Sequence, residues 1–98
     1  MRLFRRNLSF EWDEIKRLSN FEKHGIDFVQ AREAFYDENR LEEIDDRKDY
    51  GETRIRVIGR IGSELIILVV YTNRKKNIRI ISARRANEIE RERYNGNS

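Results

Sequence analysis

The sequence contains no cysteine and no proline, and it has a single histidine. Without cysteine, disulfide bonds and thiolate metal sites are excluded, and one histidine alone is a poor basis for a structural zinc site. The longest apolar run, residues 65–71, is far too short to span a membrane. The basic N-terminus lacks the apolar stretch of a signal peptide, so we expect a cytoplasmic protein that does not contact a membrane.

Charge dominates the composition that remains. The 98 residues carry a formal net charge of +3, and charged residues make up 40% of the chain against 38% hydrophobic. Arginine greatly outnumbers lysine, and its planar guanidinium matches the oxygens of a phosphate. Taken alone, this composition is better explained by an ordinary soluble surface. The length predicts one small domain, residues 1–98, and the clustered apolar residues indicate a folded core.

Hydrophobic periodicity in the first half predicts one strand and two helices. Apolar and polar residues alternate over residues 8–12, which is typical of a strand. Asp13 and Asp27 are placed to cap two short helices that meet at Gly25. The residues expected on the inner face of the first helix are Ile15, Leu18 and Phe21.

The second half predicts a meander of three or four antiparallel strands and then a helix. The predicted strands are residues 41–46, 54–60, 65–71 and 78–83, with turns at Gly62-Ser63 and at residues 73–77. Ser82 is placed to cap the final helix, which runs to Tyr94. Helices followed by hairpins favour an α+β fold: a twisted antiparallel sheet with two N-terminal helices and one C-terminal helix.

Arginines gather on these predicted strands. Arg54, Arg56 and Arg60 share one face of their strand, and Glu52 has the same parity if the strand begins that early. RNA cleavage without a metal needs a base, cationic donors for the phosphate and an acid for the leaving oxygen. An arginine-lined face with a carboxylate offers the first two. An equally good interpretation is that these charges only keep an outer sheet face solvated.

Four further cationic positions lie on or near the ends of the last two strands. Arg74 ends the central strand beside Lys75, and Arg79 lies on the last strand. Arg79 and Arg84 have opposite parity, so only a break near Ser82 would let both face a common site.

His24 and Tyr94 are the candidates for proton transfer. His24 is the single histidine, the residue type most often used for proton transfer at neutral pH, but its place at a predicted helix end favours capping over catalysis. Tyr94 lies on a polar helix near the C-terminus and is expected to be an exposed aromatic or an acid hydroxyl. Phosphate-binding loops and metal-binding motifs are absent, so no cofactor and no metal site are predicted.

Six fragments in order resemble the BrnT family of type II toxins. They are Phe10-Glu-Trp-Asp13, Lys23-His-Gly-Ile26 with Phe28 and Ala31, Gly51-Glu-Thr-Arg54, Tyr71-Thr-Asn-Arg74, Arg79-Ile-Ile-Ser-Ala-Arg84, and Ala86 with Glu90 and Tyr94. The resemblance implies a fold similar to the RelE superfamily and RNA cleavage that stops translation. It also implies a BrnA-like antitoxin with a ribbon–helix–helix part, and promoter DNA bound only through the antitoxin complex.

Together these observations predict a metal-independent endoribonuclease. Glu52 or His24 is the expected base, and Tyr94 or His24 the expected acid. The residues expected to hold the reacting phosphate are Arg54, Arg74 and Arg79, and those expected to bind RNA more widely are Arg56, Arg60, Arg84 and Lys75. Arg84 has a second interpretation, as an anchor between the last helix and the sheet. Two other functions stay open: a non-catalytic module that binds RNA or the ribosome, and an interaction scaffold.

Overall fold

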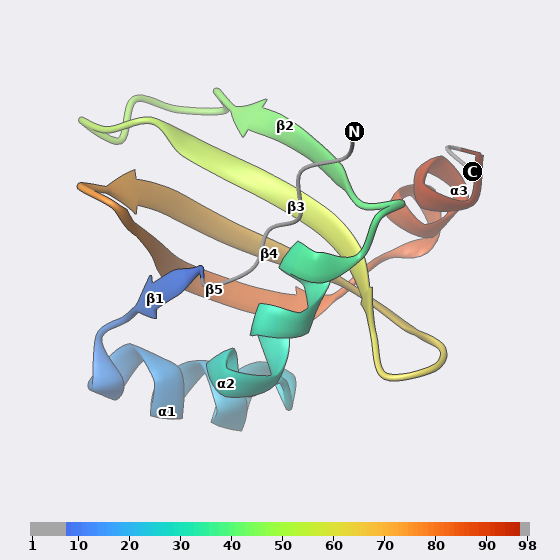
Figure 1. Ribbon diagram of the computed structural model, residues 1–98, viewed down its shortest axis with the longest axis horizontal. Helices are drawn as coiled ribbons and strands as arrows, with labels where there is room; N and C mark the ends of the chain where they lie inside the picture. The colour runs from blue at the N-terminus through green and yellow to red at the C-terminus, as the bar shows by residue number, and fades with distance from the viewer. Residues whose placement is uncertain (1–7, 97–98) are drawn as a thin grey trace.

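A five-stranded sheet in the order β1-β5-β4-β3-β2 forms the centre of the computed structural model, which describes residues 8–96. Helices α1 and α2 and the 3-10 helix η1 cover one face of the sheet, and α3 packs on the other (Figure 1). The elements are β1 (Ser9–Glu11), α1 (Glu14–His24), α2 (Phe28–Ala31), η1 (Arg32–Tyr36), β2 (Leu41–Asp45), β3 (Arg54–Ile61), β4 (Leu65–Arg74), β5 (Asn77–Arg85) and α3 (Glu88–Gly96).

The predicted α+β fold is confirmed. Strands β2 to β5 form an antiparallel meander, and the hairpin expected at Gly62-Ser63 joins β3 to β4. The sequence did not indicate where β1 would pair. It lies parallel to the edge of β5, with Glu11 opposite Arg79, and makes the sheet mixed. The helices found within residues 8–96 all fall short of the length and hydrophobicity that spanning a bilayer needs.

Two aspartates begin the N-terminal helices, as predicted. The Asp13 side chain accepts hydrogen bonds from the backbone N–H groups of Ile15 and Lys16, and Asp27 caps α2 through Val29. Gly25 ends α1 with a φ of 75°, a left-handed conformation that is unfavourable for residues with a Cβ atom. The chain therefore turns sharply between α1 and α2 at the predicted place.

Aromatic packing fills the core between the sheet and α2 with η1. The ring of Phe35 lies edge-on to Phe10 at 5.2 Å and to Tyr71 at 5.0 Å between centroids. A Cβ on Gly59 would stand 2.8 Å from the backbone oxygen of Ala34. Gly59 therefore permits the close approach of η1 to β3 that buries Phe35 completely.

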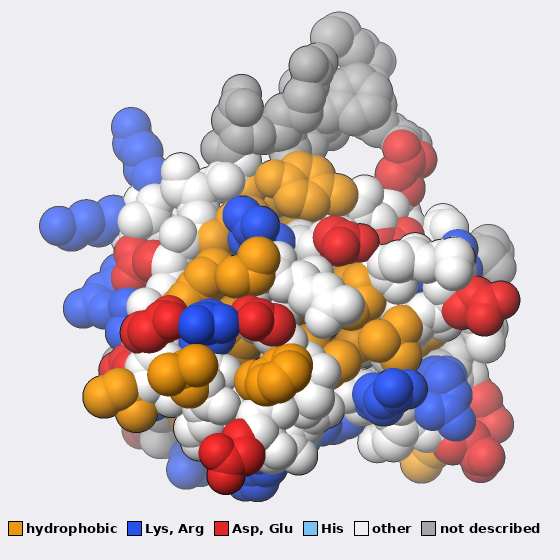
Figure 2. All heavy atoms as spheres, turned by 90° about the horizontal axis from the view of Figure 1, so that it is seen from below, with side chains coloured by type: hydrophobic (Ala, Val, Ile, Leu, Met, Phe, Trp, Pro, Cys, Tyr) orange, Lys and Arg blue, Asp and Glu red, His pale blue; other side chains and the backbone are white. Residues whose placement is uncertain are grey.

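The expectation for the inner face of α1 is wrong. Ile15, Leu18 and Phe21 are 79%, 55% and 51% exposed, and the buried residue of the helix is Asn20. The Asn20 amide donates to the backbone oxygens of Ala83 and Ile26 and accepts from the Ala83 N–H. Polar bonding, not apolar burial, holds α1 to β5, and Figure 2 shows hydrophobic side chains left on the surface of the α1 and α2 layer.

The end of the sheet also differs from the prediction. Ser82 lies within β5 instead of capping a helix, because the strand continues to Arg85. Asn87 and Glu90 begin α3 with a reciprocal pair of hydrogen bonds between side chain and backbone. An irregularity in the pairing of β4 and β5 leaves Ile81 without an opposite residue. This β-bulge restores Arg79 and Arg84 to one face of the sheet, as the break considered near Ser82 requires.

Replacing Asn20 by alanine tests the polar attachment of α1. Asn20→Ala leaves the buried backbone groups of Ala83 without partners, and we expect the free energy of unfolding to fall by about 1–3 kcal/mol. Urea denaturation measures this change. The matched control is Ser19→Ala on the exposed side of the same helix, which should change it by less than about 0.5 kcal/mol. Equal effects of the two substitutions would contradict the anchoring role.

Candidate active site

The face of the sheet that packs against α3, here called the α3 face, divides into a covered and an open part. Tyr94 of α3 packs on Ile58, Leu68 and Val70 and covers one end of the strands. Thr72 and Arg79, paired across β4 and β5, lie on the same face nearer the other end of β4. Alternation along the strands places these arginines on the α3 face. Their position along the strand then decides whether they lie beside the helix or at the open end.

A cavity of about 400 Å³ lies at this open end. It is lined by Glu52, Thr53, Thr72, Asn73, Arg74 and Arg79. The loop before β3, the end of β4 and the start of β5 each contribute side chains to it. Three predicted catalytic residues, Glu52, Arg74 and Arg79, thus line one cavity.

Hydrogen bonds fix the loop that carries Glu52. The buried Thr72 hydroxyl donates to the Thr53 carbonyl at 2.6 Å and joins the loop to β4. Arg54 donates from Nε to Glu52 at 3.1 Å, and its guanidinium lies 4.2 Å from the centre of the Tyr50 ring. Arg54, itself packed on the Tyr50 ring, therefore holds the carboxylate of Glu52 at the cavity.

A second carboxylate, Glu11 of β1, meets the arginines beside this cavity. Its oxygens accept hydrogen bonds from Asn77 at 2.8 Å and from Arg79 at 2.7 Å, and Arg74 Nη1 lies at 3.8 Å. The hydrogen bonds from Asn77 and Arg79 hold the pKa of Glu11 below its ordinary value. Glu11 was not among the predicted site residues. The alternation around Phe10 indicates that Glu11 faces outward, but only the pairing of β1 shows which strand it faces.

Two predicted RNA-binding arginines hold α3 instead. Arg84 makes a two-pronged ion pair with the buried Glu90 of α3, each bond 2.9 Å long. This geometry matches the alternative interpretation of Arg84 as an anchor. Arg56 pairs at 2.8 Å with Glu43, which also accepts from Arg93 of α3. Neither arginine lines the cavity.

The other predicted RNA-binding residues lie apart from each other. Arg60 is exposed, and its guanidinium lies 5.8 Å from the centre of the Tyr94 ring. Lys75 is exposed in the turn after Arg74, with a φ of 58°. Lys75 therefore extends the cationic surface from the cavity, and Arg60 does not.

Neither proton-transfer candidate lines the cavity. His24 is the last residue of α1, on the other side of the sheet. Tyr94 is only 3% exposed, so the expectation of an exposed aromatic is wrong. Its hydroxyl donates to Asp37 at 2.5 Å. Burial, and then this hydrogen bond, raise the pKa of Tyr94 to about 12.

Asp37 is the partner that keeps Tyr94 in place. Burial works to raise the pKa of Asp37, but hydrogen bonds from Tyr94 and from the Arg60 backbone lower it below its ordinary value. The carboxylate therefore stays ionised and ties α3 to the segment between η1 and β2.

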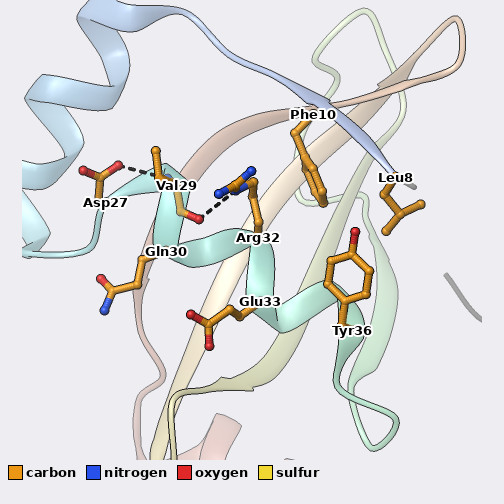
Figure 3. A pocket seen from close by; sticks show the side chains of 8 residues that line it. All are labelled: Leu8, Phe10, Asp27, Val29, Gln30, Arg32, Glu33 and Tyr36. Carbon is orange, nitrogen blue, oxygen red and sulfur yellow. Dashed lines mark hydrogen bonds between the residues drawn. The ribbon is translucent and has the colours of Figure 1, made fainter. Parts of the chain in front are cut away.

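A larger cavity of about 550 Å³ lies on the opposite side of the sheet, between β1 and the helices (Figure 3). Phe10, Val29 and Tyr36 line it with Arg32 and Glu33, and Arg32 donates to the Val29 carbonyl. None of the predicted site residues reaches it. Size alone would favour this cavity, but the smaller one joins a carboxylate to two guanidiniums, which is the arrangement that phosphate chemistry needs.

Comparison with known proteins identifies the class of this chain. The family described as ribonuclease toxin, BrnT, of type II toxin–antitoxin system matches residues 12–90. The chain therefore belongs to the BrnT family of ribonuclease toxins. A ribonuclease toxin of a type II system acts on RNA and has an antitoxin as its partner.

A solved structure gives the same result for the fold. The chain is similar to the crystal structure of the ribonuclease toxin BrnT from Brucella abortus, with a TM-score of 0.64 and 28% sequence identity. The similarity covers 84% of this chain and 100% of the Brucella chain. Among curated proteins, none matches this sequence.

Replacing Tyr94 by phenylalanine separates structural from catalytic use of its hydroxyl. In the folded protein the pKa of Tyr94 is about 12 against an ordinary value of 10.0, so its contribution to stability is complete below pH 10. That contribution is lost as the pH rises from 10 to 12. We expect Tyr94→Phe to lower the free energy of unfolding at pH 7 by about 1 kcal/mol and to show less of this alkaline loss.

Chemical denaturation across this pH range measures the difference from the wild type. RNA cleavage by Tyr94→Phe at neutral pH should equal that of the wild type. A loss of cleavage by more than tenfold (about 1.4 kcal/mol) in a folded variant would instead make the hydroxyl part of the reaction.

Proposed function

We propose that this chain is an endoribonuclease that cleaves RNA without a metal ion at the cavity of Glu52, Arg74 and Arg79. The observation that carries the proposal is the meeting of one carboxylate and two guanidiniums from separate segments around about 400 Å³. Membership of a ribonuclease toxin family supports the reaction class. Within residues 8–96, no three carboxylate or imidazole side chains lie close enough together to form a group of metal ligands.

The reaction we infer begins at the ribose. The Glu52 carboxylate takes the proton of a 2′-hydroxyl, and the 2′-oxygen attacks the adjacent phosphorus. The bond from phosphorus to the 5′-oxygen breaks and leaves a cyclic 2′,3′-phosphate. Arg74 and Arg79 donate hydrogen bonds to the phosphate oxygens as their negative charge grows.

The arginines have distinct parts in this proposal. The Arg74 side chain is 61% exposed and lies 3.8 Å from its nearest carboxylate, so it can turn to an incoming phosphate. Arg54 remains on Glu52 and orients the base. His24 and Tyr94, the acids expected from the sequence, lie outside the cavity, so the proposal takes the leaving-group proton from water that enters this exposed site.

Family membership supports a proposal for the partner and the cellular role. We propose that a BrnA-like antitoxin with a ribbon–helix–helix part neutralises this toxin in the cytoplasm, and that free toxin inhibits translation. Promoter DNA would be bound by the complex through the antitoxin. The apolar side chains exposed on α1 and α2 support a protein partner, because contiguous apolar surface is typical of contact sites.

Substitution of the proposed base tests the reaction. Antitoxin-free protein should cleave a short RNA in the presence of a chelator, and Glu52→Gln should lower kcat by about 100-fold or more. Because glutamine keeps the shape of the side chain, binding of a 2′-deoxy analogue should be retained. Glu22→Gln on the exposed side of α1 is the matched control and should cleave like the wild type.

Binding without cleavage by the wild type, with or without ribosomes, would favour the non-catalytic alternative instead. Arg74→Ala then tests whether Arg74 contacts an RNA phosphate independently of any cleavage. It should reduce the slope of log affinity against log salt by about one unit, as the loss of one phosphate contact predicts.

A further inference from the structure

The first strand brings a carboxylate to the arginines from the opposite end of the sequence. Glu11 lies on the edge strand β1, directly opposite Arg79 in the parallel pairing with β5. Asn77, two residues earlier on β5, flanks the same carboxylate. Arg74 of β4 pairs with Asn77 across the sheet and approaches Glu11 from the third side. Glu11 is thus the point where β1, β4 and β5 meet beside the cavity.

We propose that Glu11 is a positioning residue that holds Arg79 and Arg74 in the geometry needed to stabilise the reacting phosphate. This inference rests on the proposed ribonuclease function of the same site. Arg79 uses Nη1 to reach Glu11, whereas its guanidinium carries five N–H donors in all. One edge of the group is fixed by the carboxylate, and the remaining donors are left for an RNA phosphate.

The contacts of Glu11 argue against a role as the base. Both of its oxygens already accept hydrogen bonds, one from Asn77 and one from Arg79. These bonds favour the ionised form and make the carboxylate a weak proton acceptor. Glu52 is bonded only by Arg54 among the interactions of the described residues, and it lines the cavity. The two carboxylates therefore have different roles: Glu52 accepts the proton, and Glu11 orients Arg79 and Arg74.

Removing the charge of Glu11 should lower kcat without weakening the binding of RNA. A carboxylate beside the cavity repels an RNA phosphate, so Glu11→Gln should bind a 2′-deoxy analogue as well as the wild type or better. The same substitution loosens Arg79 and leaves two guanidiniums without a counter-charge. Misplaced donors stabilise the transition state less, and we expect kcat to fall by about 10–100-fold.

Steady-state cleavage of a short RNA by the full chain provides the test. Glu14→Gln is the matched control, because Glu14 pairs with Arg17 at the start of α1 and does not line the cavity. The expected result is a lower kcat with an unchanged or lower KM for Glu11→Gln, and wild-type values for the control. Nitrogen-15 spectra of arginine side chains add a structural measurement: the Arg79 Nε–H signal should broaden or disappear in Glu11→Gln and persist in Glu14→Gln.

Each outcome decides between the two claims. If the wild type cleaves RNA and Glu11→Gln has the same kcat, the positioning role is overturned and the proposed function stands. If the wild type cleaves no RNA, the proposed function fails and this inference fails with it. Should Glu11→Gln not fold, Asn77→Ala replaces it: removing the donor that holds the other oxygen of Glu11 should also lower kcat with KM unchanged.

Discussion

The parallel pairing of β1 with β5 is the constraint on which the candidate site depends. The strand has only three residues, and its side chains alternate between the two faces of the sheet. Phe10 packs against Phe35 in the core, which obliges Glu11 to face Arg79 on the opposite side. Trp12 adds a second edge-to-face contact, with Phe28. Aromatic burial on one face therefore sets the position of a carboxylate on the other.

The arginines of the α3 face serve two purposes, and apolar packing decides which. Where Ile58, Leu68 and Val70 accept Tyr94, the helix covers the sheet and the nearby arginines become its ion-pair partners. Arg84 with Glu90 is the clearest case, since a two-pronged pair at a helix end fixes both distance and orientation. Beyond the end of the helix, Arg74 and Arg79 have no such cover and remain accessible to a ligand.

Local signals in the sequence predicted the elements that depend on neighbours along the chain. Asp13 and Asp27 cap helices, and the alternation after Arg54 gives a strand with its arginines on one face, because these features need only short spacings. Glu52 and Arg74 were both predicted as site residues, and the antiparallel pairing of β3 with β4 places the start of one strand beside the end of the other, where the two residues line one cavity.

Features that depend on distant segments were not predictable in the same way. The pairing of Glu11 with Arg79 joins residues 68 positions apart and has no local signature. The apolar residues of α1 have helical spacing, so the sequence predicts that they face the core. In the structure the Asn20 amide binds the backbone groups of Ala83, and the helix therefore presents Asn20 to the sheet and its apolar residues to solvent. For Tyr94, polar neighbours in sequence indicated exposure, whereas packing on Ile58, Leu68 and Val70 buries the ring. Asp37, 57 residues away, binds its hydroxyl.

The bulge at Ile81 shows how one residue connects the two parts of the α3 face. In a regular strand, Arg84 would take the opposite face from Arg79 and would point at α1, in the space that Ala83 now fills. A guanidinium there would be buried among apolar groups at high cost. With one extra residue, Ala83 enters the core while Arg84 turns to Glu90. A single strand can therefore supply a cation to the cavity at its start and an anchor for α3 at its end, because the irregularity puts Arg79 and Arg84 on the same face of the sheet.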